Sequence, residues 1–155
     1  MVKIKSTPRF FNQIVNVLLT QTDTTVGFLS QDEKKLQEIK SRNSTKPFIK
    51  VYQNFKIFTA NNRVDDRYKN LIRRSKKTTF IVKNRAFRVA KTSLQSSFLQ
   101  NRWNYSTSAN ESGKNFNRAF CEEKADIIIE DKNSLYEGEA SKLYKLSAKR
   151  VRRLR

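Results

Sequence analysis

Histidine is absent from this chain, and cysteine occurs only once, at Cys121. Ser-His-Asp and Cys-His nucleophilic sites need a histidine base, and a disulfide needs a second cysteine, so the composition excludes all three. Zinc sites built from cysteine and histidine are excluded for the same reason. We therefore expect Cys121 to be a buried filler and any reaction to depend on other side chains.

Glycine is almost as scarce, with only Gly27, Gly113 and Gly138. Neither G-x-x-x-x-G-K-[ST] nor G-x-G-x-x-G occurs, so a nucleotide would have to be held by side chains and not by a glycine-rich phosphate loop. Glycine is needed where the backbone adopts a positive φ or approaches a ligand closely. The three positions therefore favour a retained binding site, with three ordinary turns as the alternative.

Long apolar runs are missing too. The apolar stretches are too short for a membrane span, and Asn12 and Asn16 interrupt the N-terminal run without a cleavage pattern after it, which predicts a cytoplasmic protein with no membrane partner. A length of 155 residues predicts one domain.

Acidic residues are few, with 14 Asp and Glu against 33 Lys and Arg, for a net charge of +19. The electrostatic field of such a charge attracts polyanions, among which nucleic acid is the most obvious candidate. Codon bias in an AT-rich genome is the alternative explanation for part of this excess. Against it stands the tail from Lys142 to Arg155, which contains no acid.

Alternation and helical spacing predict a mixed α/β pattern. The expected strands are 14–19, 47–51, 78–82, 86–90, one led by Trp103 and Tyr105, 125–131, 142–146 and 149–154, with a tight hairpin joining 78–82 to 86–90. The expected helices are 31–40, one or two within 52–77, 92–100 and 114–124.

Polar residues follow the first predicted strand, at the end where ligands bind in open α/β sheets, namely Thr22, Asp23 and Thr24. Ser30 and Glu33 have capping-box spacing, which places the start of the next helix. Beyond it, three cations converge around a non-helical segment closed by Pro47, and could together hold an anionic group: Lys40, Arg42 and Lys46.

A second polar block, STSANESG (106–113), follows the strand led by Trp103 and Tyr105. Serine and asparagine are ordinary turn formers, so this block taken alone favours an ordinary turn over a site. Its position directly after a buried strand favours the site.

The order of these residue types resembles the YrdC family of L-threonylcarbamoyladenylate synthases. The family pattern P-T-D-T-x-Y-G-L, then a helix, then K-x-R-P-x-x-K-P-L-I, corresponds to QTDTTVGF and KSRNSTKPFI here. STSANESG and GEAS (138–141) resemble the family's S-T-S-A-N-x-S-G and G-x-x-S-T. The resemblance implies an α/β (α+β) domain over residues 1–155, with a shortened N-terminal helix and one shortened internal loop. Its twisted, open mixed sheet would be flanked by helices around a central concave basic cleft.

The resemblance also implies a nucleotidyltransferase that joins L-threonine, bicarbonate and ATP, with Mg²⁺, into L-threonylcarbamoyladenylate and pyrophosphate for tRNA modification. Attack of a carbamate on the α-phosphate needs alignment and charge neutralisation more than a covalent nucleophile, which suits a histidine-free chain. The implied catalytic residues, which hold the ATP phosphates, are Lys40, Arg42 and Lys46. The residues implied to orient threonine and carbamate are Thr22, Thr24 and Ser108.

Further contacts to ATP are implied for Arg88, Thr107, Asn110, Ser141 and Arg153. Arg152 or Arg155 could serve in place of Arg153, and a solvated strand arginine is the alternative for Arg88. No protein metal site is expected. The implied macromolecular partners are tRNA or double-stranded RNA and other tRNA-modification proteins. Since no RNP-type aromatic motif or helix-turn-helix occurs, RNA contacts would be directed to the backbone and sensitive to salt.

The chain departs from the family pattern at several points. Gln21, Val26 and Asn43 replace the family's proline, tyrosine and second proline, and the basic run around Arg73 and Lys77 stands where W-P-G-P is expected. An adenylate-forming enzyme is therefore one hypothesis, and a relative that binds nucleotide or RNA without this reaction is the second. A purely structural basic RNA-binding protein is the third, and requires the four motif matches to be coincidental.

Overall fold

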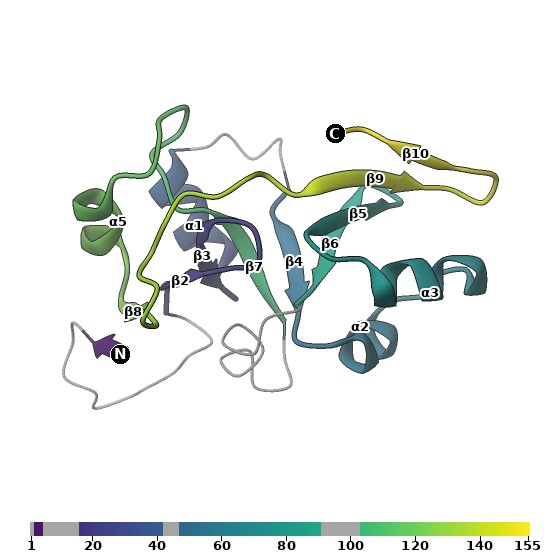
Figure 1. Cartoon of the computed structure of the whole chain (residues 1–155), viewed down its shortest axis with the longest axis horizontal. Coiled ribbons are helices and arrows are strands. Elements are labelled where there is room, and N and C mark those ends of the chain that lie inside the picture. The colour runs from purple at the N-terminus through teal and green to yellow at the C-terminus, as the bar shows by residue number, and fades with distance from the viewer. Residues whose placement is uncertain (1, 5–15, 42–46, 91–102) are drawn as a thin grey trace.

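The computed structural model describes residues 2–4, 16–41, 47–90 and 103–155, in which the chain forms one mixed sheet (Figure 1). Its strands are β1 (Val2–Ile4), β2 (Leu18–Gln21), β3 (Val26–Ser30), β4 (Ile49–Tyr52), β5 (Thr78–Val82), β6 (Arg85–Val89), β7 (Trp103–Ser108), β8 (Ile127–Ile129), β9 (Lys142–Leu146) and β10 (Val151–Arg153). Their order across the sheet is β1-β8-β2-β3-β7-β4-β6-β5-β9-β10. β2 pairs parallel with β8, β4 with β6, and β5 with β9, so the predicted mixed α/β sheet is confirmed.

The described helices cover two separate apolar clusters of this sheet. They are α1 (Glu33–Lys40), α2 (Phe55–Asn61), α3 (Asp66–Arg74) and α5 (Arg118–Lys124). Leu36 of α1 and Cys121 of α5 pack in one cluster with β2 and β3, whereas Phe58 of α2 and Ile72 of α3 pack in the other with β5 and β6. Each half of the sheet therefore has its own core. Among the described helices none has the length and apolarity that a membrane crossing requires.

Strand β3 was not predicted. All five of its residues are buried, so both faces of the strand are covered and its sequence shows no alternation. The hydroxyl-rich residues before it were interpreted as a polar turn leading directly into a helix. A central strand lies between that turn and α1, and it pairs with β2 on one side and β7 on the other.

The predicted capping box of α1 is also corrected. Asp32, not Ser30, is the N-cap, since its Oδ1 accepts from the backbone N–H of Lys34 at 3.0 Å. The hydroxyl of Ser30 accepts from the Asp32 N–H instead, and the helix begins at Glu33. Aspartate is as good an N-cap as serine, and Asp32 directly precedes the first helical residue, so Asp32 is the N-cap.

Several boundaries differ from prediction. β2 is Leu18–Gln21 instead of 14–19, and β10 is Val151–Arg153 instead of 149–154. α5 begins at Arg118, where the side chain of Asn117 accepts from Phe120 N–H at 3.1 Å, and not at residue 114. β8 is confined to Ile127–Ile129. The predicted β5–β6 hairpin is confirmed, and its turn uses Lys83 and Asn84 with φ of 46° and 62°, a pair of positive values that suits a tight two-residue connection. The predicted helix 92–100 lies outside the described residues. Of the N-terminal segment, where a shortened helix was expected, residues 2–4 are described and form strand β1, which was not predicted.

Candidate functional site

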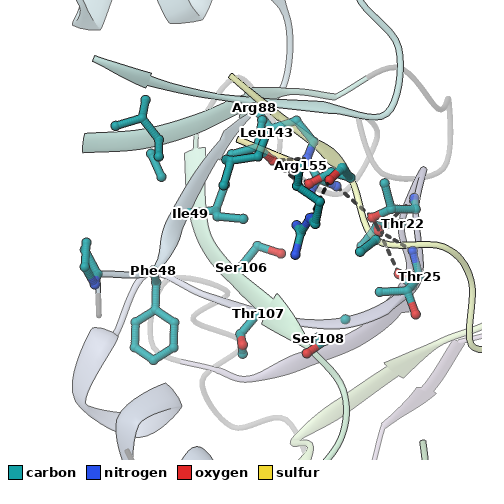
Figure 2. A pocket seen from close by; sticks show the side chains of 18 of the residues that line it. Thr22, Thr25, Phe48, Ile49, Arg88, Ser106, Thr107, Ser108, Leu143 and Arg155 are labelled. Atoms are coloured by element: carbon teal, nitrogen blue, oxygen red, sulfur yellow. Dashed lines mark hydrogen bonds between the residues drawn. The ribbon is translucent and has the colours of Figure 1, made fainter. Parts of the chain in front are cut away.

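A cavity of about 570 Å³ opens between the two halves of the sheet (Figure 2). Its described lining comes from the β2–β3 turn, the entry to β4, the β5–β6 hairpin, β7 and the segment around β9. The polar or charged members are Thr22, Thr24, Thr25, Thr79, Asn84, Arg88, Ser106, Thr107, Ser108, Ser141 and Arg155. The apolar members and glycine are Gly27, Pro47, Phe48, Ile49, Ile81, Ala86, Ala140 and Leu143.

The β2–β3 turn is held by its own hydroxyl groups. Thr22 Oγ1 donates to the carbonyl of Thr25 at 2.7 Å and lies 3.2 Å from Thr24 Oγ1. The backbone N–H groups of Thr24 and Thr25 both approach Thr22 Oγ1 at 3.3 Å. Threonine side chains commonly stabilise turns in this way, and here the same residues also form the wall of the cavity.

Arg88 of β6 joins this turn to the opposite wall. Its Nη1 donates to Asp23 Oδ1 at 2.9 Å and to Thr24 Oγ1 at 2.8 Å. Its Nε and Nη2 donate to Thr79 Oγ1 on β5 at 3.3 and 3.1 Å. The side chains of Arg88 and Asp23 are 8% and 5% exposed, so this is a buried ion pair and not a solvated strand arginine.

The network continues from Thr79 to the C-terminal strands. Thr79 Oγ1 lies 2.9 Å from Ser141 Oγ, and Arg155 Nε donates to the Ser141 carbonyl at 3.1 Å. The backbone of Arg155 is fixed against β9, where its carbonyl accepts from Leu143 N–H at 3.1 Å. Figure 2 shows Arg88 and Arg155 on one side of the cavity, with Ser106, Thr107 and Ser108 on another.

Two of the three glycines allow close backbone contact at this site. A Cβ on Gly138 would lie 2.0 Å from the carbonyl oxygen of Thr24, and one on Gly27 would lie 3.1 Å from the carbonyl oxygen of Thr107. Gly113 is different, because its φ is +78° and a Cβ there would meet nothing within 4 Å. Close approach thus explains Gly27 and Gly138, and an ordinary turn explains Gly113.

Strand β7 contributes the STS part of its polar block to the cavity, and the following residues turn away toward α1. Ser108 Oγ donates to Asn110 Oδ1 at 2.6 Å. Lys40, at the last turn of α1, is 5% exposed and its Nζ also donates to Asn110 Oδ1 at 2.6 Å. The buried Lys40 and the half-buried Asn110 therefore pair directly beside Ser108, outside the described lining of the cavity.

The predicted site residues divide into three groups. Those that line the one cavity are Thr22, Thr24, Arg88, Thr107, Ser108 and Ser141. Those that are described but do not line it are Lys40, Asn110 and Arg153. Arg153 is exposed and donates from Nε to the carbonyl of Arg155, whereas Arg155 itself lines the cavity, so the structure favours the alternative arginine. Arg42 and Lys46 lie outside the described residues.

Several lining residues were not predicted, chiefly Thr79, Ser106 and Asn84. Thr79 is fully buried in β5, so the signal available in the sequence was a pair of hydroxyl residues, Thr78 and Thr79, at the start of a strand whose other residues are apolar. Ser106 was inside the STSANESG block but was given no role. Asn84 is a hairpin residue, and nothing in its sequence context distinguishes it from an ordinary turn former.

The described lining contains no aspartate or glutamate, and among the described residues no group of three or more metal-ligating side chains occurs. These residues therefore do not fit a Mg²⁺ held by the protein, and a Mg²⁺ ion would have to be carried by the phosphates of a nucleotide. Cys121 is fully buried, and burial raises the pKa of its thiol. It is the expected filler and not a nucleophile.

Known structures share this fold. P. abyssi Sua5 complexed with L-threonine matches 90% of this chain with a TM-score of 0.72 and 19% identity, and E. coli YciO matches 91% with a TM-score of 0.73 and 16% identity. Full-length HypF in a phosphate- and nucleotide-bound form matches the whole chain with a TM-score of 0.74 and 12% identity. The chain spans 50%, 82% and 25% of those three chains.

No protein-family model and no curated protein matches the sequence itself. The similarity to the solved structures therefore lies in the arrangement of the strands. At sequence identities of 12–19% it shows a shared fold. Sua5 and YciO are members of the family whose motifs the sequence resembles, so the expected architecture is confirmed. The chain has a YrdC-like fold.

Proposed function

We propose that the cavity binds L-threonine, bicarbonate and ATP and forms L-threonylcarbamoyladenylate and pyrophosphate. In this proposal the hydroxyl groups of Thr22, Thr24 and Ser108 orient threonine and its carbamate. The nucleotide is held on the side of the cavity formed by Arg88, Ser141 and Arg155. The reaction needs alignment and stabilisation of negative charge, which hydroxyl, amide and guanidinium donors supply without a covalent nucleophile.

The observation that carries the proposal is the convergence of distant hydroxyl groups on one cavity. Residues from the TDTT turn, the STS strand and the GEAS segment line the same 570 Å³ space, although they are far apart in the chain. Two arginines share that lining, and polar groups that converge on one cavity are a common feature of small-molecule sites. The known complexes add that P. abyssi Sua5 binds L-threonine and that HypF has been seen with phosphate and nucleotide.

Ser108→Ala tests the proposed orientation of threonine. We expect kcat/KM for L-threonine to fall about tenfold, because one hydrogen bond to a charged ligand group is lost. The measurement is ATP-dependent incorporation of labelled bicarbonate in the presence of L-threonine. Ser112→Ala is the matched control, since Ser112 belongs to the same block and is exposed like Ser108 but does not line the cavity. Equal loss in both variants, or no product from folded wild-type protein, contradicts the proposal.

A second candidate function is backbone-directed binding of double-stranded nucleic acid. The observation that favours it is the uneven distribution of charge. Residues 142–155 carry seven Lys and Arg and no acid, and they meet α3, where Tyr68 Oη donates to the Ser147 carbonyl at 2.6 Å. We call this part the basic end; its exposed cations include Lys69, Arg73, Arg74, Lys76, Lys77, Lys145, Lys149, Arg150 and Arg152.

The acids near the basic end are already engaged. Hydrogen bonds from Arg67 lower the pKa of Asp65 to about 2, and Asp66 pairs with Lys69 at 2.5 Å. Within the described chain the basic end exposes no aromatic ring on which single-stranded bases could stack. A regular double helix, contacted through its phosphates, is therefore the nucleic acid that this surface suits.

The double substitution Lys149→Glu and Arg150→Glu tests this second function. We expect about tenfold weaker binding of duplex RNA at moderate salt, and a plot of log K against log salt that is shallower by about two. The control is the pair Lys34→Glu and Lys132→Glu. This pair changes the net charge of the protein by the same amount, at exposed sites away from α3 and the β9–β10 hairpin. Equal effects of the two pairs, or binding indifferent to salt, contradict a role for the basic end.

A further inference from the structure

The ion pair between Asp23 and Arg88 joins one half of the sheet to the other beside the cavity. Asp23 lies in the β2–β3 turn, whereas Arg88 is on β6, and β7 and β4 lie between β3 and β6 in the sheet. In a flat sheet with strands about 4.8 Å apart, β3 and β6 would be roughly 14 Å apart. Nη1 and Oδ1 are 2.9 Å apart, so the turn must lean over the curved sheet to reach the guanidinium.

The contacts of Arg88 leave its guanidinium almost no freedom. A guanidinium has five N–H groups. Two on Nη1 meet Asp23 and Thr24, and those of Nε and Nη2 meet Thr79, which leaves one N–H on Nη2 without a contact among the described hydrogen bonds. Arg88 lines the cavity in this fixed orientation, whereas Asp23 does not line it.

The burial of Asp23 is costly in a way that packing does not explain. Its Oδ2 is buried with no hydrogen-bond partner in the described structure, and a buried unsatisfied carboxylate oxygen is unfavourable. A neutral side chain would avoid that cost. A neutral side chain could not, however, compensate the buried charge of Arg88. Without a counter-ion, the guanidinium would draw water into the wall or move out of it.

We propose that Asp23 is a positioning residue of the cavity, which touches no ligand but fixes the Arg88 guanidinium in the cavity wall. The proposal rests on the proposed nucleotide site, because Arg88 acts there on ATP. Asp23 supplies the counter-charge, Thr24 and Thr79 set the plane of the guanidinium, and Ser141 is tied to the same network through Thr79. The affinity of the cavity for ATP then depends on a carboxylate outside its lining.

A double-mutant cycle tests this dependence through the dissociation constant for ATP, measured by calorimetry. Asp23→Asn keeps the size of the side chain and removes its charge, and we expect about tenfold weaker binding. Asp23→Glu, which restores the charge, should recover most of the affinity. Because Asp23 acts only through Arg88, adding Asp23→Asn to Arg88→Ala should cause no further loss. Additive losses overturn the proposal.

Two controls separate positioning from general destabilisation and from failure of the proposed function. Glu130→Gln breaks another ion pair, with Arg118 at 2.8 Å, and should lower stability without changing ATP affinity more than twofold. The second control needs no ligand: exchange of the Arg88 Nε proton, followed by NMR, should become at least tenfold faster in Asp23→Asn. Unchanged exchange overturns the role of Asp23. Wild-type protein that fails to bind ATP removes the proposed function, while the exchange measurement still decides the role of Asp23.

Discussion

Replacing Arg155 by alanine is expected to weaken ATP binding about 50-fold, as measured by calorimetry. Arg155 lines the cavity, its backbone is held against Leu143, and the described lining contains no aspartate or glutamate side chain to pair with its guanidinium. Arg88, the other arginine of the lining, is already paired with Asp23. The charge of Arg155 is therefore the one that a nucleotide phosphate would meet with the least competition from the described wall.

Neighbouring arginines provide the control for this prediction. Arg152→Ala and Arg153→Ala remove the same charge from β10 but not from the cavity, and each should change ATP affinity less than threefold. If Arg153→Ala has the larger effect, the structural choice between these arginines is wrong. If all three have equal effects, the cavity recognises only the general positive field of the protein.

Gly138→Ala is expected to lower the free energy of unfolding by about 3 kcal/mol, and the melting temperature by about 9 °C. The new Cβ would lie 2.0 Å from the carbonyl oxygen of Thr24, so the backbone on one side has to move. That movement breaks the hydrogen bond from Gly138 N–H to Thr25 Oγ1, now 3.1 Å long, and displaces the β2–β3 turn. Denaturant unfolding measures the loss, and ATP affinity should fall with it.

Gly113→Ala separates lack of space from backbone conformation. Gly113 has a φ of +78° but open surroundings, so alanine there should cost only about 1 kcal/mol of strain. ATP affinity should stay at the wild-type value. A loss at Gly113 as large as that at Gly138 would show that close packing around Thr24 is not what retains glycine at position 138.

The sequence allowed most strands to be located, although not all of their ends. The predicted strands 78–82 and 142–146 are confirmed with the same bounds as β5 and β9, whereas the last predicted strand, 149–154, is confined to Val151–Arg153. β3 was missed because a strand buried on both faces has no alternation to detect. The cap of α1 was misplaced because Ser30 and Asp32 are both good cap residues, and only the local backbone decides between them.

Motif order predicted much of the lining but not the direction of every side chain. Thr22, Ser108 and Ser141 meet at one cavity as expected. Lys40 does not reach that lining, because Asn110 accepts its ammonium group behind Ser108. Such a contact joins residues 70 positions apart, which spacing along the chain cannot reveal. For the same reason the pairing of Arg88 with Asp23 became visible only once the sheet was assembled.

The most direct test of the central claim is a chemical-shift map recorded by NMR while L-threonine and ATP are added to the wild-type protein. The cavity proposal predicts the largest amide shifts in three separate segments, Thr22 to Gly27, Ser106 to Ser108, and Gly138 to Ser141, which line or border the 570 Å³ space. Shifts of that kind require one site built from distant parts of the chain. Shifts confined to α3 and the β9–β10 hairpin, or none at saturating ligand, would contradict it.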